Sequence, residues 1–211
     1  MKTRERIVSA SLELFNESGE RNITTNHIAA HIEISPGNLY YHFRNKQEIV
    51  RDIFDCYSTE LLERFTPVES KEESLVLLKR YLDSIFTLMW KYRFFYSNLP
   101  EILQRDEMLH ERYLGVQEKL RKNLETIFYG FVDLKLLKVN EEEAKSLVMT
   151  LHLVASSWLG YQSAMSPRTG ITEKIIHQGV LQMIAIVKPH TTVMGRDQIQ
   201  LLEDGIKAMN N

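Results

Sequence analysis

Residues 34–50, ISPGNLYYHFRNKQEIV, concentrate side chains that can contact a polyanion. Asn38 can hydrogen-bond the edge of a base, and asparagine suits adenine in particular. Tyrosine hydroxyls, the imidazole of His42 and the N–H groups at a helix start can all donate hydrogen bonds to phosphate oxygens. Gly37 lets a backbone approach such a partner closely. The segment therefore predicts contact with DNA, with half-buried packing as the alternative role of its tyrosines and histidine.

Two short helices must position these side chains. The first begins near Thr25, a residue type suited to an N-cap, and ends where Glu33-Ile34-Ser35 interrupts its pattern. In the second, Ser35 can cap and Pro36 takes the first helical position, where its missing N–H costs nothing. Two such helices joined by a turn form a helix-turn-helix, whose second helix enters the DNA major groove by its N-terminal end.

Helices before and after are expected to brace this pair. One covers residues 4–17, has an apolar stripe at helical spacing and ends at Gly19, which suits a C-terminal cap. The other opens with Asn45 and Glu48, which have the spacing of a capping box. Lys46 lies at its start, so the ammonium charge and the helix dipole could bind the same phosphate.

The stretch TTNHIAAHIEISPGNLYYHFRNKQEIV resembles the DNA-binding domain of the TetR family of bacterial transcriptional regulators. The likeness covers roughly residues 4–54 and depends on the order and spacing of about ten positions. These positions are Ile28, Ala29, Ser35, Gly37, Leu39, Tyr40, His42, Phe43, Asn45 and Lys46. The resemblance implies phosphate contacts at Thr25, Ser35, Tyr40, Tyr41, His42 and Lys46, and base contacts at Asn26, Pro36, Gly37 and Asn38.

Two residues depart from the pattern of the family. Glu33 stands where the turn often has glycine, so a residue with a side chain is expected at positive φ, at some energetic cost. Position 36 is often basic or polar in the family, whereas Pro36 can offer only an apolar contact, for example to a thymine methyl. These departures therefore leave open which bases this chain reads.

The rest of the chain predicts an all-α fold with a second, larger domain. Glycine and proline are scarce, and Thr66-Pro67-Val68-Glu69 marks a hinge before the capping box Ser70–Glu73. Helical patterns follow over residues 71–95, 99–105, 107–136, 141–165, 172–187 and 196–209. We expect a helix-turn-helix domain of residues 1–64, including the helix that opens at Asn45, and a helical domain of residues 65–211. The resemblance implies that the second domain binds an effector and dimerises.

The segment SLVMTLHLVASSWLGYQ, residues 146–162, is apolar nearly all round and must be covered on more than one side. Residues 170–187 are similar but more polar. Two such helices from each of two chains would make a four-helix interface, and symmetric homodimers are the commonest oligomers. The resemblance implies the same arrangement, so we predict a homodimer through residues 141–165 and 172–187. The alternative is a wholly internal core.

Aromatic residues between positions 89 and 103 could line a cavity, with methionine as a soft wall. The resemblance implies a small-molecule pocket in this domain. We assign to it Trp90, Phe94, Phe95, Tyr96, Met108 and His152, and expect an apolar or amphipathic effector of unknown identity. The alternative is ordinary core packing, with His152 a satisfied core histidine.

Other patterns exclude several classes of function. No glycine-rich phosphate loop, GxSxG or HExxH occurs, so neither an enzyme nor a cofactor is expected. His27 and His31 are four residues apart but lack a third ligand, so no metal site is expected. Residues 106–111 include a polar cluster, Asp106, Glu107, His110 and Glu111, that we assign to a solvated helix face.

Compositional features predict a cytoplasmic protein without a membrane partner. Cys56 is the only cysteine, so no internal disulfide forms. The N-terminus lacks the apolar core of a signal peptide, and no apolar run reaches the ~18 residues of a membrane span. Residues 1–51 hold seven Lys or Arg and six Asp or Glu, so this part is slightly basic in a chain of net charge −2.

These features together predict a ligand-responsive repressor that binds a palindromic double-stranded DNA operator as a dimer. The rival from another class is a DNA-bound scaffold that recruits a protein partner without sensing a small molecule. A helical enzyme that carries a helix-turn-helix comes third, and activation instead of repression stays open.

Overall fold

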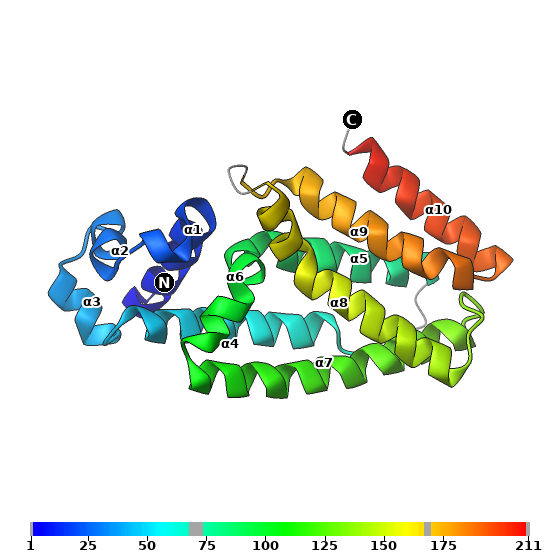
Figure 1. Cartoon of the computed structure of the whole chain (residues 1–211), viewed down its shortest axis with the longest axis horizontal. Helices are drawn as coiled ribbons and strands as arrows, with labels where there is room; N and C mark the ends of the chain where they lie inside the picture. The colour runs from blue at the N-terminus through cyan, green and yellow to red at the C-terminus, as the bar shows by residue number, and fades with distance from the viewer. Residues whose placement is uncertain (1, 68–73, 167–169, 210–211) are drawn as a thin grey trace.

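The computed structural model describes residues 2–67, 74–166 and 170–209, and these residues form an all-α protein, as predicted. Figure 1 shows a smaller helical head at one end and a larger helical body, joined by the long helix α4. The head and the link are α1 (Thr3–Ser18), α2 (Thr25–His31), α3 (Pro36–His42) and α4 (Lys46–Arg64). The body contains α5 (Ser74–Lys91), α6 (Arg93–Gln104), α7 (Glu107–Asp133), α8 (Glu141–Met165), α9 (Glu173–Val187) and α10 (Val193–Ala208). The predicted boundary between residues 64 and 65 stays a prediction.

The head encloses its own small core, because α1 packs against both α2 and α4. Ile7, Phe15, Ile28, Leu39 and Phe43 are all almost completely buried there. Burying a side chain of this size contributes about 1.5–3 kcal/mol. The face of α3 that carries Leu39 is therefore held inward, and its other face is left for solvent.

The link α4 belongs to both parts of the molecule. It contacts α1 in the head and both α5 and α7 in the body (Figure 1). Ile49 and Ile53, near its start, are buried, and so are Tyr57 and Leu61 farther along. A shift of the body against α4 would therefore reach the head through a continuous helix.

The body is a bundle in which α8 lies against α6, α7 and α9. The indole of Trp158 on α8 crosses to α9, where its Nε1–H donates to the carbonyl of Ile175 at 2.8 Å. A Cβ atom at Gly179 would come within 2.6 Å of this indole, so α9 needs glycine at that position. The η2 turn (Lys188–His190) then leads into α10, which packs on α9 and α5.

Several helix ends differ from the predicted ones. Thr24, and not Thr25, is the N-cap of α2, because its hydroxyl accepts the His27 N–H at 3.3 Å. Glu48 accepts the N–H of Arg44 at 2.8 Å, so it completes the cap of α4 one residue before Asn45. The predicted caps at Gly19, Asn140 and Thr172 are confirmed, and so is the helix end before Lys188. The apparent capping box Ser70–Glu73 lies outside the described residues.

The predicted helix over residues 71–95 is wrong at its end. It breaks at Tyr92, and α6 then runs on through Pro100. Pro100 kinks α6 at Asn98, where φ is −127° and ψ is 16°, because a proline ring clashes with the helical turn before it. The Asn98 side chain donates to the carbonyl of Phe94 at 2.9 Å, which bridges the distorted turn.

Two further observations concern membrane spans and metal sites, neither of which the sequence predicts. No helix within the described ranges is long and apolar enough to cross a membrane. Among the same residues, no group of three or more His, Cys, Asp or Glu could hold a metal ion.

Candidate nucleic-acid interface and internal cavity

The turn between α2 and α3 fixes the angle of the helix-turn-helix. Ile34 N–H donates to the Ala29 carbonyl at 3.0 Å, and Glu33 takes φ 58°, the left-handed conformation predicted for it. The Tyr40 hydroxyl lies 3.0 Å from Thr25 Oγ1, so it ties α3 to the start of α2. Both side chains were predicted to contact phosphate; the structure also gives them a role in joining the two helices.

The strained turn leads to a stability prediction. Replacing Glu33 by glycine is expected to stabilise the protein by about 0.5–1 kcal/mol. The substitution removes the cost of a side chain at positive φ, about 1–2 kcal/mol, but the greater conformational freedom of glycine in the unfolded state offsets part of this gain. Chemical denaturation would measure the change. Glu33→Ala keeps the Cβ atom and should give no gain; equal stabilisation by both variants would contradict the strain argument.

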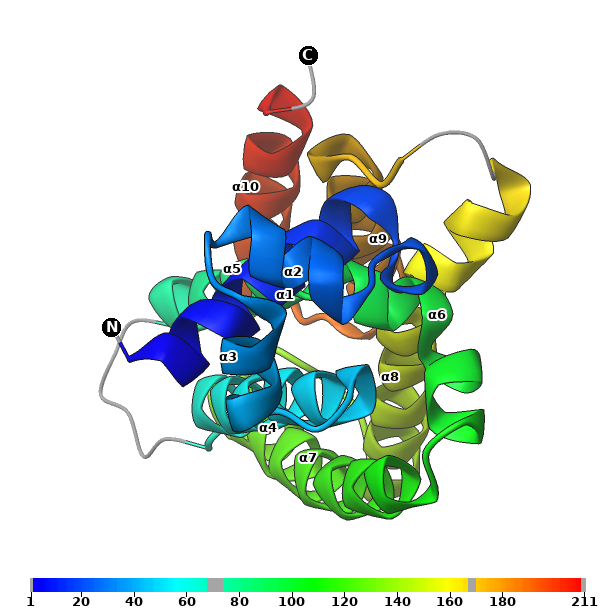
Figure 2. The ribbon, with the colours of Figure 1, turned by 90° about the vertical axis from the view of Figure 1, so that its left-hand side faces the viewer.

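The predicted base-reading residues of the head are exposed to solvent. Asn26, Pro36, Gly37 and Asn38 are all exposed, and Tyr41 is 85% exposed. Figure 2 presents this end of the molecule, with α3 in front of α4 and below α2. The arrangement leaves one side of α3 open to a partner, and the individual base contacts stay predictions.

Two other predicted contacts also serve the head itself. Ser35 caps α3, with its Oγ accepting the Asn38 N–H at 3.2 Å. The half-buried His42 ring lies edge-on to Tyr41, with 5.2 Å between ring centroids, and the His42 carbonyl accepts from Arg4 at 3.0 Å. Both residues therefore hold the exposed side chains of α3 in place.

Lys46 is engaged inside the protein. Its Nζ donates to the carbonyls of Glu20 and Ile23 at 2.7 and 3.0 Å, and lies 2.9 Å from the Glu20 carboxylate. An ammonium has three donors, and these three oxygens can occupy all of them. The structure therefore favours Lys46 as a brace between α4 and the segment before α2, and its predicted phosphate contact stays untested.

Arg44 is a candidate that the sequence patterns did not single out. It is exposed between α3 and α4, and within the described residues its guanidinium has no hydrogen bond or ion pair. Most other cations of the head are engaged: Arg4 with Asp52, Arg6 with the Ile32 carbonyl, and Arg21 with Glu101. The only sequence signal was its position next to the capping residue Asn45.

Replacing Arg44 by alanine is expected to weaken binding to all duplex DNA by a similar factor, because a phosphate contact carries no base information. The slope of log affinity against log salt should fall by about one. Fluorescence anisotropy over a range of salt concentrations would measure both. Arg112→Ala, which removes an arginine of the body, is the matched control, and an unchanged slope in Arg44→Ala would remove Arg44 from the interface.

Two consecutive charged residues at the junction between α6 and α7 hold the body against the head and α4. Arg105 donates to Glu20 at 2.8 Å, and Glu20 is only 5% exposed. Burial disfavours the charged form of Glu20, but hydrogen bonds from Arg105 and Lys46 outweigh this and lower its pKa. One buried carboxylate thus joins the body, the head and the start of α4.

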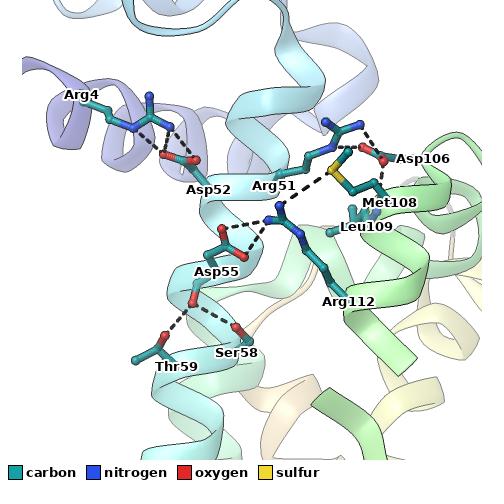
Figure 3. Close-up of polar contacts among 10 residues, drawn as sticks. All are labelled: Arg4, Arg51, Asp52, Asp55, Ser58, Thr59, Asp106, Met108, Leu109 and Arg112. Atoms are coloured by element: carbon teal, nitrogen blue, oxygen red, sulfur yellow. Dashed lines mark hydrogen bonds and ion pairs between the residues drawn. The ribbon is translucent and has the colours of Figure 1, made fainter. Parts of the chain in front are cut away.

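The second junction residue, Asp106, was predicted to be solvated and is instead buried. Its two oxygens accept from Arg51 of α4 at 2.7 and 2.9 Å, and one also caps α7 through the Leu109 N–H at 3.1 Å. A carboxylate at an N-cap with a bidentate arginine has strong, charge-assisted partners. Figure 3 shows three ion pairs along α4: Arg4–Asp52, Arg51–Asp106 and Arg112–Asp55.

An internal cavity of about 170 Å³ lies in the body, lined by residues of α4 to α10. Of the predicted pocket residues, Phe95, Tyr96 and His152 line it. Its lining also includes Tyr57 and Gln117, which the sequence patterns did not single out. Gln117 follows Tyr113 by four residues on α7, and that spacing on one helix face was the available signal.

The other three predicted pocket residues lie outside the cavity. The Arg93 guanidinium covers the half-buried Trp90 ring at 4.3 Å from its centroid. Phe94 packs on Phe15 of the head, with 5.3 Å between ring centroids, and Met108 is 48% exposed. The break at Tyr92 accounts for the position of Phe94, because α6 starts after it with Phe94 packed on the head and Phe95 lining the cavity.

An exposed apolar stripe runs along α8, one of the predicted dimer helices. Met149, Leu153, Tyr161 and Met165 follow at multiples of four residues and are 62%, 59%, 56% and 64% exposed. The exposed positions of α9 are instead charged, polar or small: Glu173, Lys174, Gln178, Gln182 and Ala185. Large apolar side chains left exposed along a helix are typical of a surface that a partner covers.

Comparisons with known proteins agree with this architecture. Residues 7–53 match the family model described as "Bacterial regulatory proteins, tetR family", and residues 56–199 match the model described as "Bacterial transcriptional repressor". The crystal structure of a TetR-family transcriptional regulator from Marinobacter aquaeolei VT8 is 34% identical, with a TM-score of 0.87 over 98% of this chain and 99% of that one.

Two curated proteins are also similar. The negative transcriptional regulator IcaR of the biofilm operon icaADBC, from Staphylococcus aureus strain Newman, is 26% identical over 176 residues, which are 81% of this chain and 89% of that protein. The class G tetracycline repressor from Vibrio anguillarum is 32% identical over 87 residues, and this match spans only 41% of either chain.

Proposed function

The chain belongs to the TetR family of bacterial transcriptional regulators, and from this premise we propose that it represses transcription as a homodimer on a palindromic operator until a small molecule releases it. It is a DNA-binding transcriptional regulator, and members of its family are generally non-enzymatic. The operator, the dimer and the effector are the parts that we propose.

The observation that carries the operator proposal is the open face of α3. Asn38 and Tyr41 project from it, Arg44 follows it, and Leu39 anchors its opposite face in the core. Asn38 can read a base edge in the major groove, while Tyr41 and Arg44 can contact phosphates. The first turn of α3 is capped by Ser35, so the reading residues are presented on an ordered helix.

The dimer proposal is supported by the apolar stripe of α8. Pairing two such stripes about a two-fold axis would cover Leu153 and Tyr161 of both chains. A dimer reads two half-sites at ~34–36 Å or multiples of this distance, so its operator should be palindromic. The polar outer face of α9 would then border the apolar centre of the interface.

The release proposal is supported by the helices that line the cavity. Phe95 and Tyr96 lie on α6 and Gln117 on α7, on either side of the Arg105–Asp106 junction that holds the head. A ligand that binds one spacing of α6 and α7 better than another would shift the junction, and with it Glu20 and α4. Such differential affinity is the physical requirement for any effector.

Selection from a random double-stranded DNA pool at fixed salt tests the proposal. The parent should enrich a palindrome, and a variant carrying Asn38→Ala and Tyr41→Ala should not; both substitutions are at exposed positions and should leave the fold intact. Equal enrichment by both proteins would remove α3 as the reading helix. Enrichment of a single, non-repeated site would contradict the dimer on a palindrome.

A further inference from the structure

We propose that the effector is a neutral, largely apolar molecule with one hydroxyl group, an alcohol or a phenol, whose O–H donates to Gln117 Oε1. This inference is built on the proposed function, because it names the ligand class of the same cavity. Two properties of the cavity carry it: the kind of residue that lines the wall, and a buried acceptor without a donor.

Among the described residues that line the cavity, none is Asp, Glu, Lys or Arg. Most of the wall consists of leucine, isoleucine, valine, methionine and phenylalanine side chains. A carboxylate or a quaternary ammonium entering it would lose its hydration without gaining an opposite charge, which is costly in an apolar medium. Burial also disfavours the cationic form of His152, because it lowers the pKa of the imidazole. The wall therefore selects a neutral ligand.

Gln117 Oε1 is buried and has no hydrogen-bond partner, and it is the one such side-chain atom among the described residues. Gln117 lies on α7 and lines the cavity. A buried acceptor without a donor costs about 1–3 kcal/mol, so native structures rarely leave one empty. A donor arriving with the ligand would remove this cost.

Tyrosine hydroxyls give the wall a second polar feature. The hydroxyls of Tyr57 and Tyr96 are 3.1 Å apart and buried, and Tyr113 lies one turn before Gln117 on α7. In the Tyr57–Tyr96 pair one hydroxyl donates to the other, so the pair keeps one O–H and spare lone pairs. A ligand hydroxyl both donates and accepts, which a ketone or an ether cannot do. The body of the ligand would extend toward the apolar wall formed by Ile199 and Leu202 of α10.

Isothermal titration calorimetry with four probes of equal chain length tests the inference: n-decanol, its methyl ether, decanoate and decyltrimethylammonium. The parent should bind the alcohol roughly tenfold more tightly than the ether, because only the alcohol can donate to Gln117. Both charged probes should bind at least about a hundredfold more weakly than the alcohol. In Gln117→Met, which keeps the length of the side chain, alcohol and ether should bind within about twofold of each other.

Four results would overturn the ligand class: a charged probe that binds as tightly as the alcohol, equal binding of alcohol and ether to the parent, a preference for alcohol that survives in Gln117→Met, or no binding of any probe. The preference of the parent alone tests the inference, so it does not depend on the folding of the variant.

Operator affinity, measured separately by fluorescence anisotropy, distinguishes this inference from the proposed function. If n-decanol binds with the expected selectivity but leaves operator affinity unchanged, the ligand class stands and ligand-controlled release fails. If decanoate releases the operator and n-decanol does not, release stands and the ligand class fails.

Discussion

Replacing Leu153 by glutamate is expected to convert the protein to a monomer and to lower its affinity for a two-site operator by roughly two to four orders of magnitude. Leu153 is 59% exposed near the middle of the α8 stripe. Across a two-fold interface each substitution would bury two carboxylates in an apolar contact, which is strongly unfavourable. In a dimer, binding of one head holds the second head at a high effective concentration near its half-site. A monomer loses this effect, which raises overall affinity by about 10²–10⁴-fold.

Light scattering would give the mass of the variant in solution, and titration of DNA with one or two half-sites would give its affinity. Affinity for a single half-site should stay within a few-fold of the parent, because the head is unchanged. Leu114→Glu is the matched control, since Leu114 is 55% exposed on α7, away from the stripe. A dimeric Leu153→Glu protein, or a control that dissociates to the same extent, would contradict the proposed interface.

Replacing Asp106 by alanine is expected to destabilise the protein by about 3 kcal/mol, because breaking a buried pair leaves the remaining charge uncompensated. The pair is well shielded, since the side chains of Arg51 and Asp106 are 28% and 5% exposed. The substitution also removes the cap of α7, a loss of typically about 1 kcal/mol that is included in this figure. Urea denaturation monitored by circular dichroism would measure the change.

The same pair predicts a pH dependence. Burial opposes ionisation of Asp106, but hydrogen bonds from Arg51 and the Leu109 N–H outweigh it and hold the pKa below its ordinary value of 3.8. A carboxyl with a depressed folded-state pKa stabilises the protein above its unfolded-state pKa and loses this contribution as pH falls through the folded-state value. The difference between parent and variant should therefore be constant near neutral pH and shrink only below about pH 4.

The neighbouring ion pair of Arg112 and Asp55 is the control for Asp106→Ala. Its side chains are 44% and 54% exposed, so Arg112→Ala should cost no more than about 1 kcal/mol. Equal losses from Asp106→Ala and Arg112→Ala would mean that burial at the α6–α7 junction contributes nothing beyond a surface pair.

Local features of the head could be predicted because their causes lie within a few residues. Ser35 caps α3, and Pro36 takes its first position, through contacts within a single turn. Gly19 ends α1 at φ 79°, and Glu33 takes φ 58° in the turn, as the sequence predicts. Leu39 faces the core because helical spacing places it there. The family resemblance, the all-α class and the helix-turn-helix followed from such short-range patterns.

Only the tertiary structure decided which of the candidate side chains are available to a partner. The ammonium of Lys46 reaches oxygens of Glu20 and Ile23, more than twenty residues away in sequence. Asp106 meets Arg51 from a different helix, so a residue that resembles surface in its own segment becomes buried. These contacts depend on how helices pack, which no local pattern contains.

The lining of the cavity likewise depends partly on local sequence and partly on helix packing. The aromatic residues between positions 89 and 103 predict a pocket. The break at Tyr92 determines that Phe95 and Tyr96 line the cavity and that Phe94 does not. Gln117 becomes a buried acceptor only where α7 closes over the other helices. The sequence by itself determined the helical class, most of the elements, several of their caps and the family. The packing of those elements decided which side chains they bring together, because a side chain's burial and partners depend on the helices that meet there.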